Sequence, residues 1–294
     1  MVLVVNTKAR RGRDAFDGAC RALLARGLEL VAAYPVRKPA QMSAVVRHEI
    51  AAGRRTIVVG GGDGTVTMVA DCFANSDAVL GLLPLGTGNS FAQGLGIPTD
   101  IGDAADVIAG GRAVSVDLGL LDGRPFVNFA TVGLSSAVAR QTKPLVKRLF
   151  GPLGYVLTGI MLAGRHRAFT CRLEGDDGVH VFKTHQLVIA NGRIFGTTAL
   201  HPDARLDEGR LTVFAVPGAN RRQIHRTWMA LLRGSHVNLS DAFFLSTARL
   251  ELTTEPRRRI EADGESAGRT PATFEVASHA LRVFAPATFQ ESAP

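Results

Sequence analysis

The first third of the chain alternates short apolar runs with stretches of helical periodicity. Apolar runs at 2–5, 28–34, 56–59 and 78–85 are predicted to be buried strands. Between them, apolar positions recur at spacings of three and four residues, which is typical of amphipathic helices. A repeating strand and helix order predicts a parallel sheet with helices on both faces. We therefore expect a doubly wound α/β domain over residues 1–114.

After about residue 112 the pattern changes to a period of two. The stretches 113–134 and 168–191 each contain an Asp-Gly pair between alternating apolar positions, which is typical of hairpins. We therefore expect an all-β second domain over 115–294, antiparallel and resembling a β-sandwich, whose last residues return to the first domain. Further strands are predicted over 210–216, 248–254, 258–265, 272–277 and 280–286, and helices over 135–165 and 220–233.

Two glycine-rich stretches follow predicted strands. GGGDGT (60–65) and PLGTGNSFA (84–92) each lead from a strand into a helix. Ligands of open parallel sheets bind beyond the carboxyl ends of the strands. Glycines at such a place let backbone N–H groups approach a phosphate at a helix N-terminus. Two neighbouring loops therefore favour a nucleotide-phosphate site over two structural turns, although neither has the Gly-Lys-Ser/Thr ending of a P-loop.

A basic stretch also follows the first predicted strand. Its polar residues Asn6, Lys8, Arg10 and Arg11 are candidates to contact the nucleotide phosphates, because the glycine loops contain no lysine. A solvated basic loop is the alternative interpretation for each of them.

Acidic residues cluster late in the chain, in RRRIEADGESA (257–267). Ile260 and its neighbours are predicted to be strand, and Asp263, Gly264 and Glu265 to be a tight turn. Glu261, Asp263 and Glu265 nevertheless alternate in register, which would let the carboxylates of Asp263 and Glu265 face one cleft. Phosphoryl transfer to an alcohol requires a carboxylate that accepts the hydroxyl proton and others that hold Mg²⁺. A hairpin turn without chemistry is the alternative.

In this order the motifs resemble those of the bacterial diacylglycerol kinases, lipid kinases that are similar to the sphingosine kinases. The resemblance rests on GGDGT (61–65), GTGNSFA (86–92), HPDARLDEG (201–209) and ADGE (262–265), and covers almost the whole chain. It implies an ATP-dependent kinase that phosphorylates a hydroxyl of diacylglycerol or a related lipid. Because GGDGT alone is shared with NAD kinases, a kinase of a soluble substrate is one alternative. A nucleotide- or lipid-binding regulator without turnover is another.

The resemblance implies roles for individual residues. Glu265 would accept the proton of the lipid hydroxyl, with Asp263 as its partner or as an alternative base, and Asp63 would belong to the Mg²⁺ and phosphate network. Together with the candidates after the first strand, the expected ATP-binding residues are Asn6, Lys8, Gly61, Gly62, Asp63, Gly64, Thr65, Val66, Thr87, Gly88 and Asn89.

A structural Mg²⁺ is implied by the motif at 201–209. Glu208 would supply a side-chain ligand, and Arg205 and Arg210 would supply backbone oxygens. The chain departs from the family pattern here, because Asp is more usual at this position than Glu208. It also has Ser90 where Asp is usual and Thr-Met at 67–68 where Asn-Glu is usual, so altered nucleotide or substrate contacts are expected.

The charge balance favours an anionic partner. Lys and Arg number 34 against 26 for Asp and Glu, which gives a formal net charge of +8. Phosphates, acidic membranes and nucleic acids all fit this balance. Nucleic acid is not expected, because the chain has only two Tyr and one Trp and no basic run interleaved with aromatic residues.

The apolar stretch 149–164 bears on the membrane. It is uncharged but shorter than the roughly 20 residues that span a bilayer, so we expect a buried helix or, alternatively, a patch that touches an anionic membrane.

Three separated cysteines predict free thiols in a reducing compartment. The MVLVVN start is too short for a signal peptide. A cytoplasmic protein, peripheral at the inner face of the membrane, is expected; a homodimer is left open.

Overall fold

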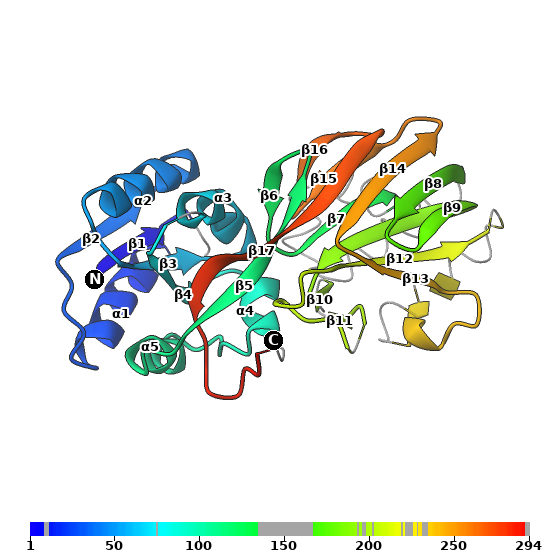
Figure 1. Cartoon of the computed structure of the whole chain (residues 1–294). Helices are drawn as coiled ribbons and strands as arrows, with labels where there is room; N and C mark the ends of the chain where they lie inside the picture. Colours follow the sequence, from blue (N-terminus) through cyan, green and yellow to red (C-terminus); the bar gives the residue numbers. More distant parts are fainter. Residues whose placement is uncertain are drawn as a thin grey trace. The chain divides into compact units, whose positions relative to one another are not determined.

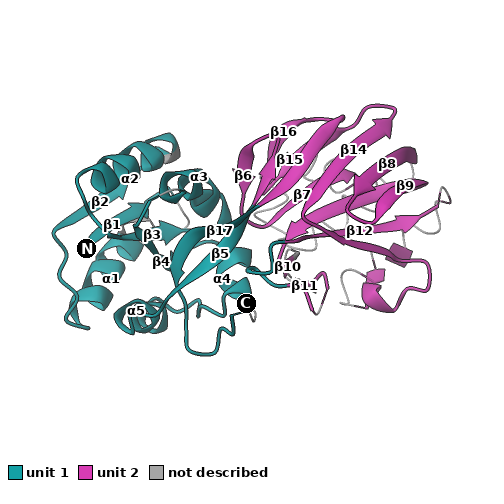
Figure 2. Cartoon of the chain, viewed as in Figure 1, with its two compact units in different colours: residues 1–118, 205–209, 277–294 teal, residues 119–204, 210–276 magenta. Residues whose placement is uncertain are grey.

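The computed structural model describes residues 1–8, 12–74, 76–134, 167–192, 194–195, 198–201, 203–218, 220, 226–227, 229–230 and 235–291. The chain divides into two compact units that are each built from separate segments (Figure 2). Unit 1 comprises 1–118, 205–209 and 277–294, and unit 2 comprises 119–204 and 210–276. The predicted helix over 135–165, most of that over 220–233, and Arg10 and Arg11 lie outside the described residues.

Unit 1 contains a parallel sheet. Its strands β1 (Val2–Asn6), β2 (Ala32–Val36), β3 (Thr56–Gly61) and β4 (Val79–Pro84) lie in the order β2-β1-β3-β4, and the end of β17 (Ala272–Phe284) pairs with β4 (Figure 1). All of these pairs are parallel. The apolar runs of β1 and β3 are fully buried, as expected for strands covered on both faces.

Helices cover both faces of this sheet. Helix α1 (Gly12–Leu24) packs against α5 (Ile101–Ala109), and α2 (Met42–Ala51) packs against α3 (Asp63–Phe73). Figure 1 shows the two pairs on opposite faces, which confirms the doubly wound prediction. Helix α5 was not predicted. Unit 1 also contains the short helix α4 (Ser90–Gly94) and the 3-10 turn η1 (Pro39–Gln41).

Unit 2 is antiparallel. Its strands pair in the order β16-β15-β7-β9-β8-β14-β17, and β12 pairs with β9 and β13. Strand β5 (Ala113–Leu121) enters it from unit 1 and pairs with β6. The remaining bounds are β6 (Arg124–Phe126), β7 (Phe129–Gly133), β8 (Phe169–Gly175), β9 (Gly178–Asn191), β10 (Ile194–Phe195), β11 (Thr198–Ala199), β12 (Leu211–Pro217), η2 (His236–Asn238), β13 (Phe243–Thr247), β14 (Arg249–Glu255), β15 (Arg259–Ala262) and β16 (Glu265–Arg269).

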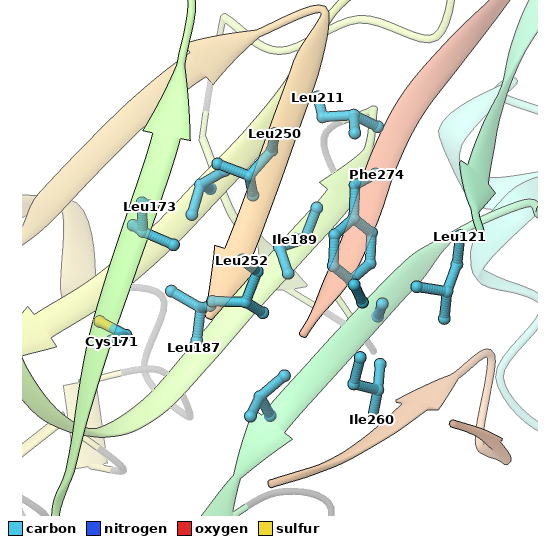
Figure 3. Close-up of a cluster of buried hydrophobic side chains, with 14 of the residues drawn as sticks. Leu121, Cys171, Leu173, Leu187, Ile189, Leu211, Leu250, Leu252, Ile260 and Phe274 are labelled. Carbon is cyan, nitrogen blue, oxygen red and sulfur yellow. The ribbon is translucent and has the colours of Figure 1, made fainter. Parts of the chain in front are cut away.

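The core of unit 2 follows from the period-two pattern. In β14 the apolar residues Leu250 and Leu252 are buried, whereas Glu251 between them is exposed. Figure 3 shows these leucines beside Ile189 and Phe274, which come from β9 and β17. One apolar face of the strands therefore forms a single buried cluster.

Two strand predictions need correction. Residues 272–277 and 280–286 were expected as separate strands, but β17 runs without a break over Ala272–Phe284. His279, at a polar interruption of the pattern, has a positive φ of 51° and its N–H donates to Asp117 Oδ1 at 2.8 Å. The interruption is therefore a local bend inside one strand. Strand β13 was not predicted.

His236 is a buried polar residue within unit 2. It is 0% exposed, its ring lies edge-on to Phe214, and its Nε2 lies 2.7 Å from the carbonyl oxygen of Leu200. Its Nδ1 has no hydrogen-bond partner. Burial lowers the pKa of His236, because the charged imidazolium would lose its hydration.

We expect acid to destabilise the protein through His236. Because the folded-state pKa lies below the ordinary value of 6.5, the unfolded chain takes up the proton first as the pH falls. The stabilising contribution is complete above about pH 6.5 and is lost as the pH falls through the folded pKa. Chemical denaturation at pH values between about 7.5 and 5, the range in which histidine titrates, measures this loss as a change in the free energy of unfolding. His236→Gln should flatten the dependence, and equal profiles for the wild type and this variant would contradict the prediction.

Candidate active site

The first glycine loop joins β3 to α3. Gly62 is the N-cap of α3, and its carbonyl oxygen accepts bonds from the N–H groups of Thr65 and Val66 at 2.8 and 3.2 Å. A Cβ atom at Gly61 would lie 2.5 Å from the side chain of Thr65. Glycine is therefore required where the strand turns into the helix. Thr65 and Val66 are buried, whereas Gly64 is exposed with nothing within 4 Å of an added Cβ.

The second glycine loop joins β4 to α4 and is closed by Asn89. This residue is in the left-handed conformation, with φ 55° and ψ 43°. Its Oδ1 accepts from Gly86 N–H at 2.9 Å and its Nδ2 donates to the Gly86 carbonyl at 3.1 Å. Asn89 is buried and its side chain closes the loop, whereas the adjacent Thr87 is exposed.

The structure brings the two loops together. Oδ1 of Asp63 accepts from the N–H of Phe91 at 3.1 Å, which ties the start of α3 to the first turn of α4. A Cβ atom at Gly86 would lie 2.5 Å from the Cα of Gly62, so the two backbones approach as closely as glycine permits. A Cβ at Gly88 would lie 3.1 Å from Asp63 Oδ2. Asp63 is thus the acidic residue shared by both loops.

The end of β1 reaches the same edge of the sheet. Asn6 Nδ2 donates to Thr65 Oγ1 at 3.0 Å, and Asn6 Oδ1 accepts from the N–H of Lys8 at 3.1 Å. Lys8 is exposed. The segment that follows β1, which contains Asn6 and Lys8, therefore lies next to the first glycine loop. This is expected because β1 and β3 are neighbours in the sheet and β3 leads into that loop. Thr67 stands where the family pattern usually has Asn. Its hydroxyl donates to the carbonyl oxygen of Asp63 at 3.0 Å.

The late acidic cluster occupies a tight turn in unit 2. Asp263 and Gly264 both have positive φ angles, 48° and 85°, and connect β15 to β16. Because this turn interrupts the strand, the expected alternation of carboxylates does not hold: Glu261 is 5% exposed, whereas Glu265 is exposed on β16. The predicted tight turn is therefore confirmed, whereas the predicted alternation of the three carboxylates in one register is wrong.

Asp263 makes several backbone contacts. Its Oδ2 accepts from Val127 N–H at 2.7 Å, and its Oδ1 accepts from the N–H groups of Asn128 and Phe129 at 3.0 and 3.2 Å. Its own N–H donates to the Phe129 carbonyl. These bonds fix the β15–β16 turn against the β6–β7 turn. In contrast, no side-chain hydrogen bond or ion pair of Glu265 occurs with the described residues.

The segment 205–210, which the family resemblance implies to hold a structural Mg²⁺, is held in place by hydrogen bonds within the protein. Arg205 Nε lies 3.3 Å from Asp207 Oδ1, and its guanidinium also donates to the Gln290 carbonyl. Arg210 bonds Ser246 and Asp176 in unit 2. Glu208 is partly buried. Among the residues that the structure describes, no three His, Cys, Asp or Glu side chains are grouped to hold a metal ion.

Asp117 was not among the residues for which the sequence predicted a role. It is 1% exposed in β5, and its Oδ2 and Oδ1 accept from the N–H groups of Gly209 and His279 at 2.6 and 2.8 Å. Its N–H donates to the Leu206 carbonyl at 2.6 Å. Asp117 therefore anchors 205–209 within unit 1. The only sequence signal for it was one carboxylate in an otherwise apolar strand.

Oxygen donors at the glycine loops fit a magnesium ion that arrives with nucleotide phosphates. Mg²⁺ is commonly held by one or two carboxylates, with phosphate oxygens and water completing its octahedron. Asp63 supplies one carboxylate beside backbone N–H groups suited to phosphate. At 205–210 the donors would be Glu208 and backbone carbonyls, which are also oxygen ligands.

A parallel sheet with two joined glycine loops at its carboxyl edge is typical of a protein that binds nucleotide phosphates. Residues 1–121 match the family model of the diacylglycerol kinase catalytic domain, and residues 128–285 match that of the YegS C-terminal NAD kinase beta sandwich-like domain. The chain belongs to the diacylglycerol kinase family. It is a kinase that uses ATP, and the prediction of a β-sandwich-like second domain is confirmed.

Several relatives carry the name diacylglycerol kinase. That of Staphylococcus epidermidis is 30% identical over 235 residues, 78% of this chain and 74% of the relative. Those of Staphylococcus saprophyticus and Staphylococcus aureus are 29% and 31% identical, covering 86% and 78% of this chain and 84% and 74% of the relatives. The predicted family is therefore confirmed.

Solved structures share the fold. The crystal structure of a diacylglycerol kinase from Bacillus anthracis has a TM-score of 0.76 at 19% identity and covers 98% of this chain and 97% of that chain. Another Bacillus anthracis structure has a TM-score of 0.83 at 23% identity and covers 98% and 96%. Within the described part of the chain, no helix has the length and apolar character needed to cross a membrane.

Proposed function

We propose that the protein transfers the γ-phosphate of ATP to the hydroxyl of a membrane lipid, most simply diacylglycerol. The observation that carries this proposal is the pair of glycine loops joined through Asp63, in a chain of a family whose relatives are named diacylglycerol kinase. The domain assignment is part of the proposal: the ATP-binding domain begins at residue 1 and ends near 114, and the lipid kinase domain follows.

Unit 1 would bind ATP. Backbone N–H groups of both loops would donate to phosphate oxygens, and the start of α3 would add partial positive charge. The exposed residues Gly64 and Thr87 leave room for the nucleotide, and Lys8 would compensate phosphate charge. Val66, whose side chain is buried, would contribute only through its backbone.

Unit 2 would supply the base. The lipid oxygen forms the new bond to the γ-phosphorus while the bond to the β,γ-bridging oxygen breaks and ADP leaves. The hydroxyl proton passes to the carboxylate of Glu265, which is exposed and able to accept it. Asp263 would position Glu265 rather than act as the base, because both of its oxygens accept backbone hydrogen bonds.

Magnesium would neutralise charge on the phosphates when bound. Asp63 is the proposed ligand at the glycine loops, and Glu208 with the carbonyls of Arg205 and Arg210 is the proposed structural set. Contact with the inner, anionic face of the membrane is also proposed, because the lipid substrate resides there and the chain has a net charge of +8.

Transfer of labelled γ-phosphate tests the proposal. Purified protein would be incubated with labelled ATP and either diacylglycerol in neutral detergent micelles or NAD. Label in the lipid supports the proposal. Label in NAD alone would favour the soluble-substrate alternative, and ATP binding without labelling of any lipid in a broad panel would favour a regulator without turnover.

A further inference from the structure

Five arginines lie together in unit 2 at the open end of the β15–β16 hairpin. Arg259 and Arg269 are directly opposite each other in the two strands. Arg258 donates to the carbonyl oxygen of Arg167 at 2.9 Å, and Arg257 Nε donates to the carbonyl oxygen of Thr270 at 2.8 Å. We call Arg167, Arg257, Arg258, Arg259 and Arg269 the arginine cluster; all are exposed except Arg258, which is partly buried.

The arginine cluster lacks acidic partners. Among the described residues, none of its members forms an ion pair with a carboxylate, whereas four other arginines of unit 2 each do. Like charges directly opposite in an antiparallel pair repel each other, so the Arg259 and Arg269 arrangement costs stability unless an anion approaches. The paired arginines are Arg172, Arg210, Arg226 and Arg249.

Arg258 is the partly buried member of the arginine cluster. Its guanidinium lies 5.1 Å above the Phe169 ring, and its buried Nε has no hydrogen-bond partner. Burial lowers the pKa of Arg258, because the cation loses hydration without gaining a carboxylate. The exposed arginines Arg257 and Arg259 beside it extend the same uncompensated positive charge to the surface.

The surrounding sequence favours a lipid surface as that anion. No Asp or Glu occurs between residues 123 and 173, so the sequence that leads into Arg167 adds no negative charge. Nucleic acid fits less well, because base-stacking surfaces interleave cations with aromatic residues. An array of acidic lipid headgroups matches a group of exposed arginines that have no carboxylate partners among the described residues.

We propose that the arginine cluster is a docking surface for an anionic phospholipid bilayer. The proposal rests on the proposed lipid kinase function, because strand β16 carries Glu265 at one end and Arg269 at the other. Four residues of strand span roughly 13 Å. Docking through the arginines would hold the proposed base close to the headgroup level, where a lipid hydroxyl lies.

Vesicle co-sedimentation tests the docking surface. The full chain would be mixed with phosphatidylcholine vesicles that contain or lack phosphatidylglycerol. The double variant Arg259→Gln/Arg269→Gln should bind the anionic vesicles about 30-fold more weakly, because each arginine near such a surface contributes about a fivefold factor. The matched control, Arg172→Gln/Arg249→Gln, removes the same charge from paired positions and should bind as the wild type does. Added salt should weaken wild-type binding.

Two further readouts separate the possible failures. The double variant should melt no lower than the wild type, because a repulsive pair is removed, and should phosphorylate micellar diacylglycerol at the wild-type rate. If the wild type labels no lipid but vesicle binding still depends on the two arginines, the proposed function fails and the docking surface stands. Equal vesicle binding by the wild type and the double variant would overturn the docking surface. So would arginine-dependent binding to a DNA duplex without binding to vesicles.

Discussion

Replacing Glu265 with glutamine is expected to lower phosphoryl transfer to lipid by about 10²- to 10⁴-fold, the usual contribution of a general base. Glutamine keeps the size of the side chain but does not accept the hydroxyl proton. Because Glu265 is exposed and its side chain makes no hydrogen bond with the described residues, the melting temperature and the affinity for ATP should not change. Turnover with micellar diacylglycerol and equilibrium ATP binding measure the two effects.

Asp263 provides the contrast for this experiment. Asp263→Ala would leave three backbone N–H groups of the β6–β7 turn without their acceptor. Each unsatisfied buried group costs about 1–3 kcal/mol, so unfolding should become measurably easier. An unchanged stability for Asp263→Ala, or full turnover for Glu265→Gln, would contradict the roles proposed for the turn.

Replacing Gly86 with alanine is expected to disrupt both glycine loops. The added Cβ would lie 2.5 Å from the Cα of Gly62 and 2.6 Å from Asn89 Oδ1, so backbone atoms of two loops must move apart. Overpacking of this kind costs about 1–3 kcal/mol. We expect a lower melting temperature together with a large loss of ATP affinity, measured by calorimetry.

Gly64 is the matched control within the same loops. It has ordinary backbone angles and nothing within 4 Å of an added Cβ, so Gly64→Ala should keep the stability of the wild type. If the loop binds phosphate through its backbone, the extra methyl group should still weaken ATP binding. Wild-type ATP affinity in both glycine variants would show that these loops are structural turns only.

Most of the fold could be predicted from periodicity. The buried strands β1 and β3 and the hairpin at Asp122 and Gly123 follow from local patterns of apolar residues and turn residues. The continuous strand β17 could not, because the bend at His279 is stabilised by Asp117, which lies far away in the sequence.

The candidate site was predictable in composition but not in geometry. The glycine loops follow strands in the sequence, but the Asp63 contact with Phe91 depends on the order of β3 and β4 in the sheet. The tight turn expected at Asp263 and Gly264 is confirmed, but its positive φ angles end the alternation that would have placed Asp263 and Glu265 in one register. Local pattern alone therefore does not distinguish a positioning carboxylate from an exposed one.

The most direct test of the central claim measures transfer of labelled γ-phosphate from ATP to diacylglycerol by three proteins: the wild type, Asp63→Asn and Glu265→Gln. The account predicts labelled lipid with the wild type and strongly reduced labelling with each variant, while Glu265→Gln still binds ATP. Wild-type labelling by both variants would contradict it.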